Sequence, residues 1–361
     1  MALFGIWELY FTCFRHAKLR AFENETCFTG GESKPISVII SARNEATNLE
    51  AFLPAILTQN YPVFEVIVVN DRSWDNTEEV LKSLCLNYAN LKVVTITHND
   101  KFIAGKKFAL SMGIKAAKYD WLVFTDADCL VNSENWLSYM QDPADGKTEI
   151  KLGYSPYFKK SSFLNLMIRY ETFYTAVNYL AFALTRNPYM GVGRNMAYNK
   201  SLFFKSKGFA SHMHIPSGDD DLFINQNANS HNTQIVIAPE SHVWSAPKLK
   251  LIDYIRQKKR HRGAGTSYKG KHRLTITIQF LLPFIFFALT IIGICFEPTR
   301  YFALAALGFV YLIKAYVYPR LYTKLSYGEL KWFFPILDIL YLCFLLWTGF
   351  IGFFIKKGQW K

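Results

Sequence analysis

Two aspartates stand directly after a short apolar run, with one small residue between them. The run is Trp121–Phe124, and Asp126 and Asp128 follow it closely. Such a run predicts a buried strand, so both carboxylates come at its carboxyl end, the edge where open α/β sheets bind ligands. Carboxylate oxygens are the ligands that Mg²⁺ and Mn²⁺ prefer, and these cations offset the charge of a bound diphosphate. An isolated Asp-x-Asp is a weak signal, so its weight comes from its surroundings.

Three further polar clusters follow strand or turn patterns: Ser41–Glu45, Asn70–Asp75 and Gly218–Asp221. Each could be a turn that caps a helix, and Asp75 is well placed to cap the helix predicted from Thr77. A parallel sheet, however, gathers the carboxyl ends of its strands into one crevice, which favours a binding site. There Asp71 could accept hydrogen bonds from a base or a ribose. Lys106 could offset phosphate charge, and Lys107 is nearly as good a candidate, although both could be solvated residues at a helix start.

Strand and helix patterns alternate over residues 36–130. Strands are predicted at Ile36–Ala42, Phe64–Val69, Leu91–Thr97 and Trp121–Thr125. Helices are predicted between them at Asn48–Leu57, Thr77–Tyr88 and Lys106–Lys118. Further strands are predicted at Gly191–Tyr198 and Gln234–Ala238, and further helices at Phe163–Arg186 and Leu249–Gln257. This alternation predicts an α/β fold with a mixed, mostly parallel sheet covered by helices on both faces.

The composition points toward a membrane. Apolar residues make up 51% of the 361 residues and aromatic residues 17%, which is high for a soluble protein. Apolar segments cover residues 274–296, 301–318 and 332–355; the first and last are long enough to span a bilayer, whereas the second is shorter and contains Lys314. The net charge of +13 is concentrated in Arg256–Arg273, which holds eight basic residues and no acidic one. Beside an apolar segment, this run favours a cytoplasmic flank on anionic membrane lipid, and we expect no nucleic acid partner.

The sequence leaves the number of spans open. Residues 1–34 begin with an apolar, aromatic segment followed by basic residues, which predicts an interfacial membrane anchor. Three spans after a cytoplasmic domain would put the C-terminus outside, whereas Lys356, Lys357 and Lys361 favour the inside. Either one apolar segment is re-entrant, or the N-terminal segment is a shortened span. Asp338 in the last segment could be functional, or it could sit near an interface or pair with a neighbouring helix. The six cysteines are scattered, which indicates neither a disulfide framework nor a zinc site.

The order of these motifs resembles glycosyltransferase family 2, the inverting nucleotide-sugar transferases with a GT-A fold, and in particular its membrane-bound branch. The matching stretches are Ser41–Glu45, Asn70–Thr77, Gly105–Leu110, Asp126–Asp128, Gly191–Tyr198, Gly218–Leu222 and Gln257–His261. Their order and spacing are far more specific than any single stretch. The resemblance implies a GT-A (Rossmann-like) domain at residues 35–262, preceded by the anchor segment 1–34 and followed by a transmembrane region at residues 263–361.

The resemblance also implies roles for individual residues. The donor would be bound by Ser41, Arg43, Glu45, Asp71, Lys106 and Asp126. Asp128, with Asp126, would hold Mg²⁺ or Mn²⁺ on the diphosphate, and Asp220 would be the general base. The acceptor and the diphosphate would be bound by Asp219, Gln257, Arg260 and His261. The family usually shows Gln-x-x-Arg-Trp, so His261 replaces an aromatic platform, and Asp219 stands where the family often has Glu.

The expected activity is the metal-assisted transfer of a sugar from a nucleotide-diphosphate donor, a UDP-sugar, to a hydroxyl of a lipid or glycan acceptor. The protein would be a multi-pass membrane protein with its catalytic domain on the cytoplasmic side. A processive polysaccharide synthase of the same family is an alternative. So is a catalytically idle membrane scaffold that keeps the nucleotide-sugar fold. A nucleotidyltransferase acting on lipid phosphate fits less well, because the first strand lacks a Gly-rich phosphate-binding signature.

Overall fold

The computed structural model describes residues 2–23, 33–97 and 105–354. Helices are α1 (Ala2–Tyr10), the π-helix η1 (Phe11–His16), α2 (Ala17–Ala21), α3 (Ala46–Leu57), α4 (Thr77–Asn87), α5 (Lys106–Ala116), α6 (Trp136–Met140), α7 (Phe163–Leu184), α8 (Lys200–Lys205), α9 (Asp221–Asn227), α10 (Leu251–Gly265), α11 (Gly270–Cys295), α12 (Glu297–Lys324) and α13 (Phe334–Phe354), with short 3₁₀ turns at Ala210–His212, Pro239–Ser241 and Gly328–Leu330. Strands are β1 (Ile36–Ala42), β2 (Phe64–Asp71), β3 (Leu91–Ile96), β4 (Trp121–Phe124), β5 (Cys129–Val131), β6 (Ile150–Leu152), β7 (Met196–Asn199), β8 (Thr233–Ile235) and β9 (Val243–Ser245). The C-terminal lysines Lys356, Lys357 and Lys361 lie outside the described residues.

Seven strands form one mixed sheet in the order β3-β2-β1-β4-β7-β6-β8. Strands β1 to β4 are parallel to one another, and β7 runs antiparallel to both of its neighbours. Strand β1 is buried along its whole length, as expected for a central parallel strand covered on both faces. Its alternate side chains enter two cores, Val38 with α3 on one face and Ile39 with α5 on the other. The predicted α/β fold with a mostly parallel sheet is confirmed.

Helix α5 lies unusually close to the sheet. A Cβ atom at Gly113 would lie 2.8 Å from Ile39 Cγ2 and 2.9 Å from Val69 Cγ2, which is closer than a real Cβ can approach. Glycine therefore lets the helix pack directly on β1 and β2. Since α5 begins at Lys106, this packing also sets where the Lys106 side chain lies relative to the strand ends.

Several predicted elements differ in extent from the structure. The strand predicted at Gln234–Ala238 is β8, which ends at Ile235. The predicted strand at Gly191–Tyr198 forms only from Met196, because Asn195 turns the chain by hydrogen bonding Tyr154 O and Ser241 O through its side-chain amide. The amphipathic helix predicted at Leu249–Gln257 continues as α10 to Gly265. The short middle apolar segment lies within α12, a helix of 28 residues.

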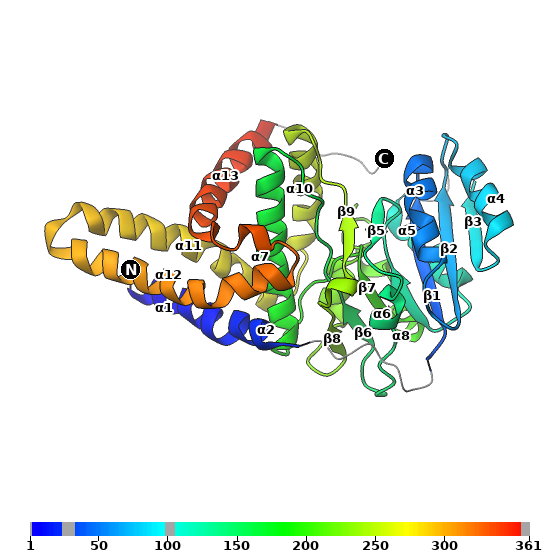
Figure 1. Ribbon diagram of the computed structural model, residues 1–361, viewed down its shortest axis with the longest axis horizontal. Coiled ribbons are helices and arrows are strands. Elements are labelled where there is room, and N and C mark those ends of the chain that lie inside the picture. Colours follow the sequence, from blue (N-terminus) through cyan, green and yellow to red (C-terminus); the bar gives the residue numbers. More distant parts are fainter. Residues whose placement is uncertain (1, 24–32, 98–104, 355–361) are drawn as a thin grey trace.

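Helices α11, α12 and α13 are each long and apolar enough to cross a membrane. Helices α11 and α12 form a hairpin that projects away from the sheet, and the N-terminal helices lie along it (Figure 1). The Lys314 ammonium of this hairpin pairs with Asp338 of α13 at 3.0 Å and lies 3.6 Å from Glu8 of α1. Asp338 is thus paired with a neighbouring helix, one of the alternatives considered for it. The long apolar helices support membrane association, while the domain boundaries at residues 34 and 262 stay predictions.

Candidate active site

The Asp126 and Asp128 side chains emerge in the turn between β4 and β5. Strand β4 is fully buried, whereas both aspartates are half-buried at the strand's carboxyl end. One ligand atom from each of Asp126, Asp128 and Cys129 lies within 4.8 Å of the others. The local sequence therefore places two carboxylates at the edge of the sheet, as predicted.

Cys129 is chemically different from its two acidic neighbours. Burial, together with the charges of Asp128 and Asp126, raises the pKa of the Cys129 thiol well above its usual value. The thiol stays protonated and donates a weak hydrogen bond of 3.5 Å to Asp128 Oδ1. Without a metal the ionised ligands are therefore the two carboxylates, which fit hard cations such as Mg²⁺ or Mn²⁺ better than Zn²⁺.

Lys106 joins the aspartates after β4 to those before α9. Its ammonium lies 2.7 Å from Asp126 Oδ1 and 3.1 Å from Asp219 Oδ2. Burial lowers the pKa of Lys106, but the charges of Asp126 and Asp219 outweigh it and raise the pKa above its ordinary value. The adjacent Lys107 points elsewhere, with its ammonium donating to the carbonyls of His212 and Ile215. Of the two lysine candidates, only Lys106 contacts the acidic cluster.

Asp220 is held at the start of α9 by backbone amides. Gly218, with φ of +91°, turns the chain into the acidic segment. Asp220 Oδ2 then accepts from the Gly193 N–H at 2.9 Å, and Oδ1 accepts from the Asp221 N–H at 2.7 Å. These bonds use only part of the acceptor capacity of a carboxylate, so the fixed side chain can still accept a proton.

The environments of Asp219 and Asp220 push their pKa values apart. Burial and the charge of Asp219 raise the pKa of Asp220 above its ordinary value. For Asp219, burial also opposes ionisation, but the Lys106 ammonium outweighs it and lowers the pKa. Neighbouring carboxyl groups with divergent pKa values are typical of acid–base sites, where the more basic one takes the proton.

The loops after β1 and β2 lie at the same sheet edge and are bonded to each other. Asn44 and Arg72 both adopt φ of +56°, which is uncommon for residues with a side chain. The Asn44 N–H donates to Ser73 Oγ, and Asn44 Oδ1 accepts from the Trp74 N–H. Asp75 Oδ1 accepts from the Thr77 N–H, the first of α4, although the N-cap position itself is Asn76.

The predicted donor-binding residues line these two loops. Asp71 is fully buried, and its Oδ1 accepts from Arg72 Nε at 2.7 Å. Its Oδ2 has no hydrogen-bond partner among the described residues, which leaves a buried acceptor at the strand end. The Arg43 guanidinium lies 5.3 Å from the ring of the exposed Trp74. Ser41 is buried at the end of β1, and Glu45 accepts a hydrogen bond from Asn48 at 2.6 Å.

Helix α10 carries Gln257, Arg260 and His261 past the acidic cluster. Ser217 Oγ donates to the Arg260 carbonyl at 2.8 Å, which fastens the helix to the loop that precedes Asp219. The side chains of Gln257 and Arg260 are half-buried and that of His261 is exposed. None of the three is hydrogen bonded to the acidic side chains within the part of the chain that the structure describes.

Arg194 is a site residue that the sequence analysis missed. Its guanidinium lies 4.4 Å from the Tyr157 ring. Burial lowers the pKa of Arg194, but Tyr157, Cys129 and the more weakly acting Asp126 and Asp128 outweigh it and raise the pKa above its ordinary value. Its Nη1 is buried and has no hydrogen-bond partner among the described residues. The sequence predicted a strand from Gly191, but β7 begins only at Met196, so Arg194 lies in the loop before it. The one signal in the sequence that could have identified Arg194 was its basic side chain close to a strand end.

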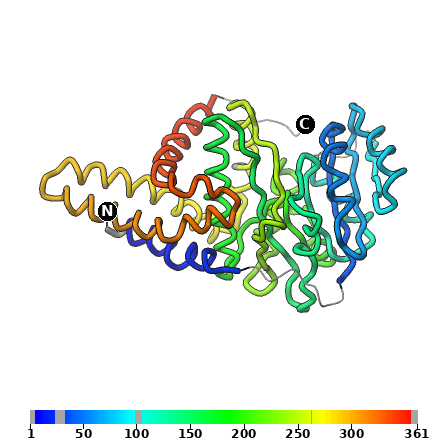
Figure 2. Tube along the Cα trace, viewed as in Figure 1, coloured from blue at the N-terminus to red at the C-terminus, as the bar shows by residue number. Residues whose placement is uncertain are grey.

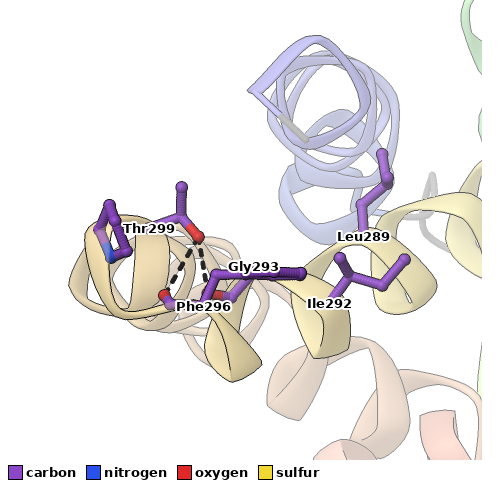
Figure 3. A pocket seen from close by; sticks show the side chains of 6 residues that line it. Leu289, Ile292, Gly293, Phe296 and Thr299 are labelled. Atoms are coloured by element: carbon purple, nitrogen blue, oxygen red, sulfur yellow. Dashed lines mark hydrogen bonds between the residues drawn. The ribbon is translucent and has the colours of Figure 1, made fainter.

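A separate hollow of about 450 Å³ lies at the tip of the α11–α12 hairpin. Its lining is Leu289, Ile292, Gly293, Phe296, Pro298 and Thr299 (Figure 3). The Thr299 hydroxyl is already bonded to the Gly293 and Phe296 carbonyls. With no charged group and no free polar one in its lining, this hollow offers no chemistry comparable to that of the acidic cluster.

Comparison with known proteins points to one family. The family described as glycosyl transferase family 2 matches residues 37–206. A 4,4'-diaponeurosporenoate glycosyltransferase of Staphylococcus haemolyticus is 34% identical over 146 residues, which is 38% of each chain. A poly-beta-1,6-N-acetyl-D-glucosamine synthase of Staphylococcus epidermidis is 33% identical over 99 residues, 27% of this chain and 23% of the synthase. The matched part of the chain thus spans well under half of the length of these relatives.

Among solved structures, a mannosyltransferase from Pyrobaculum calidifontis in complex with GDP-Man and Mn²⁺ superposes with a TM-score of 0.56 at 18% identity. The match covers 94% of this chain and 97% of that one. At this identity, the likeness concerns the fold alone, which is the GT-A fold.

The two-carboxylate donor set leads to a prediction for metal binding. We expect Asp128→Asn to raise the Kd for Mn²⁺ by at least about tenfold, because loss of a supporting group alone costs that much at many metal sites. Electron paramagnetic resonance titration of free Mn²⁺ measures this. The control is Cys129→Ala, which removes a protonated thiol and should leave the Kd unchanged; a loss of binding in that variant would contradict the assignment.

Proposed function

We propose that the chain, whose residues 37–206 match glycosyl transferase family 2, transfers a sugar from a nucleotide-diphosphate donor to a lipid or glycan acceptor hydroxyl, with inversion. The observation that carries the proposal is that the Lys106 ammonium contacts both Asp126 and Asp219, the neighbours of Asp128 and Asp220, at the edge where β1, β2 and β4 end. Inverting transfer needs a base on the acceptor side and positive charge at the leaving diphosphate, and the site offers both.

The proposed mechanism assigns the proton to Asp220. An acceptor hydroxyl is a poor nucleophile, so the raised pKa of Asp220 suits it to take the hydroxyl proton as the oxygen attacks the anomeric carbon. Its carboxylate is oriented by the Gly193 and Asp221 amides. Mg²⁺ or Mn²⁺ held by Asp128 and Asp126 would offset the charge of the diphosphate.

Binding of the donor falls to the loops after β1 and β2. We propose that the unpaired Asp71 Oδ2 accepts from the base, that Ser41, Arg43 and Glu45 line the nucleotide pocket, and that Lys106 lies beside the donor sugar. Arg194 would donate its free Nη1 to the diphosphate. Gln257, Arg260 and His261, on the membrane-proximal helix α10, would meet the diphosphate and the acceptor together with Asp219. We propose a UDP-sugar as the donor.

The acceptor side adjoins the membrane helices, since α10 leads through a short link into α11. This favours an acceptor carried by membrane lipid and, given the basic run at Arg256–Arg273, a catalytic domain on the cytoplasmic side. The similarity to a poly-beta-1,6-N-acetyl-D-glucosamine synthase supports a second candidate, a processive polysaccharide synthase. Product length separates the two: a single added sugar supports the first, and long polymer supports the second.

A donor screen on detergent-purified protein tests the proposal. Incubation with Mg²⁺ or Mn²⁺, a panel of UDP-, GDP- and dTDP-sugars and a membrane lipid extract should release nucleoside diphosphate from one donor. In Asp220→Asn the rate should fall about 10²- to 10⁴-fold, the usual contribution of a general base. The exposed Asp120→Asn is the matched control. Full activity in Asp220→Asn would overturn the mechanism, and folded protein that neither binds nor cleaves any donor would indicate an idle scaffold.

Lys106 should set the acidic limb of the pH–rate profile. The Lys106 charge lowers the pKa of Asp220, so Lys106→Gln should raise that pKa. Because the base must be ionised to accept a proton, the acidic limb of kcat/KM should move to higher pH, by about one unit. The exposed Lys115→Gln, at the other end of α5, should leave the limb in place. A limb that does not move in Lys106→Gln would remove Asp220 from the role of base.

Arg194 should recognise the diphosphate specifically. A hydrogen bond to a charged group contributes about 1.5–3 kcal/mol, so Arg194→Gln should weaken binding of the nucleoside diphosphate by about 10- to 100-fold. Calorimetry should show no change in the binding of the nucleoside alone. Arg256→Gln, an exposed change on α10, serves as the control. Equal loss for nucleoside and nucleoside diphosphate would mean that Arg194 has a structural role only.

A further inference from the structure

Helix α13 is hydrogen bonded near its start, middle and end to α7 and α10. These two helices belong to the part of the chain that holds the sheet and the acidic cluster, which we call the catalytic unit. Helix α13 is nevertheless long enough to cross a membrane. Near its start, Asp338 accepts a hydrogen bond from the Tyr170 hydroxyl of α7. In its middle, the Tyr341 hydroxyl donates to Glu171 Oε1 of α7 at 3.1 Å. Near its end, the Gly352 carbonyl accepts from the Lys259 ammonium of α10 at 2.7 Å.

Both partner helices are anchored on the catalytic side. The Tyr179 hydroxyl of α7 donates to the Gly153 carbonyl beside β6, and the Arg260 carbonyl of α10 accepts from Ser217 next to the acidic cluster. A helix that crossed the bilayer would carry its far end about 30 Å from that side. Instead, the last described turns of α13 contact the charged helix α10, which borders the candidate site.

The opposite face of α13 is an exposed apolar stripe. Its members are Ile336, Ile339, Leu346, Trp347, Phe350, Phe353 and Phe354, each about half or more exposed. Leu337, Tyr341 and Phe344, on the face of α13 that packs against the catalytic unit, are buried. A helix with one face bonded to protein needs a nonpolar cover over its exposed apolar face, which the acyl chains of a leaflet supply.

The arrangement of the helices indicates what covers the stripe. The α11–α12 hairpin projects away from the catalytic unit, whereas α13 rises beside α7 and α10 (Figures 1 and 2). The hairpin surface is apolar too, with Ile292, Phe309 and Leu312 more than half exposed, so the stripe adjoins a surface that must itself lie in lipid. Lys331 precedes the helix and Arg256 lies exposed on α10, where both can meet anionic headgroups.

We propose that α13 is a re-entrant membrane helix: its apolar stripe docks into the acyl chains of the leaflet on the catalytic side, and the chain returns to that side. Of the three long apolar helices that the structure describes, only α11 and α12 then cross the bilayer. This topology also agrees with the basic C-terminal residues Lys356, Lys357 and Lys361, which belong on the cytoplasmic side by the positive-inside rule. This proposal for α13 does not depend on the proposed sugar transfer.

The topology links the membrane to helix α10 through one buried carboxylate. Glu171 accepts hydrogen bonds from Tyr341 of α13 and from Tyr254 of α10, and it pairs with Lys258 of α10 at 2.7 Å. A helix seated in the leaflet therefore shares one carboxylate with the helix that carries Gln257, Arg260 and His261.

Cysteine labelling in membrane vesicles tests the sidedness. In a parent with every cysteine but the buried Cys129 replaced by alanine, single cysteines are placed at Lys82→Cys in α4, at Glu297→Cys at the hairpin tip, and after Lys361. With a membrane-impermeant maleimide, the Lys82→Cys and appended cysteines should react in the same vesicle orientation, and Glu297→Cys in the opposite one. An appended cysteine that reacts together with Glu297→Cys means that α13 crosses the bilayer, which overturns the proposal.

A second measurement asks what covers the stripe. A fluorophore on Phe350→Cys, in reconstituted vesicles, should be quenched by phospholipids with spin labels on their acyl chains. The same fluorophore on Lys82→Cys should not be quenched. If the fluorophore on Phe350→Cys is not quenched by these lipids, or if Phe350→Cys oxidises to a crosslinked dimer, a second copy of the chain covers the stripe instead of lipid. Either result would overturn the assignment.

Discussion

The contact of one ammonium with two carboxylates is the interaction on which the candidate site depends. Asp126 and Asp219 come from segments far apart in the chain, and Lys106 lies within 3.1 Å of both. Without that cation the half-buried Asp126 and the buried Asp219 would repel one another, since a charge in such a place is costly unless it is paired. The same cation lowers the pKa of Asp219 below its ordinary value, while burial and the charge of Asp219 raise the pKa of Asp220, so the two values diverge.

The position of this cation is a consequence of packing in the core. Helix α5 reaches β1 and β2 closely because Gly113 presents no Cβ to Ile39 and Val69. Lys106 and Lys107 are adjacent, yet one enters the acidic cluster while the other donates to backbone carbonyls of a loop. Neighbouring residues on a helix point about 100° apart, so the rotation of α5 on the sheet decides which lysine serves the site.

The membrane part and the site are joined through a few buried polar side chains. Glu171 of α7 accepts a hydrogen bond from Tyr341 of α13 and pairs with Lys258 of α10. Asp338 of α13 pairs with Lys314 of α12. Buried charges of this kind are stable only when they are paired and hydrogen bonded. The position of the membrane helices is therefore specified by particular partners as well as by apolar surface, which is how a helix as apolar as α13 can stay bound to the catalytic unit.

The sequence by itself determined the features that depend on local pattern. Apolar runs and turn residues predicted β1 to β4 and the helices between them, and the parallel arrangement implied that Asp71, Asp126 and Asp128 share one edge. Only the tertiary structure decided that Arg194 faces the acidic cluster, that Lys106 and not Lys107 binds it, and that α13 lies against α7 and α10. The physical reason is the range of each interaction. Periodicity reports which residues of one element face a core, whereas these contacts join side chains from elements distant in the chain, whose rotation and height are fixed only when they pack.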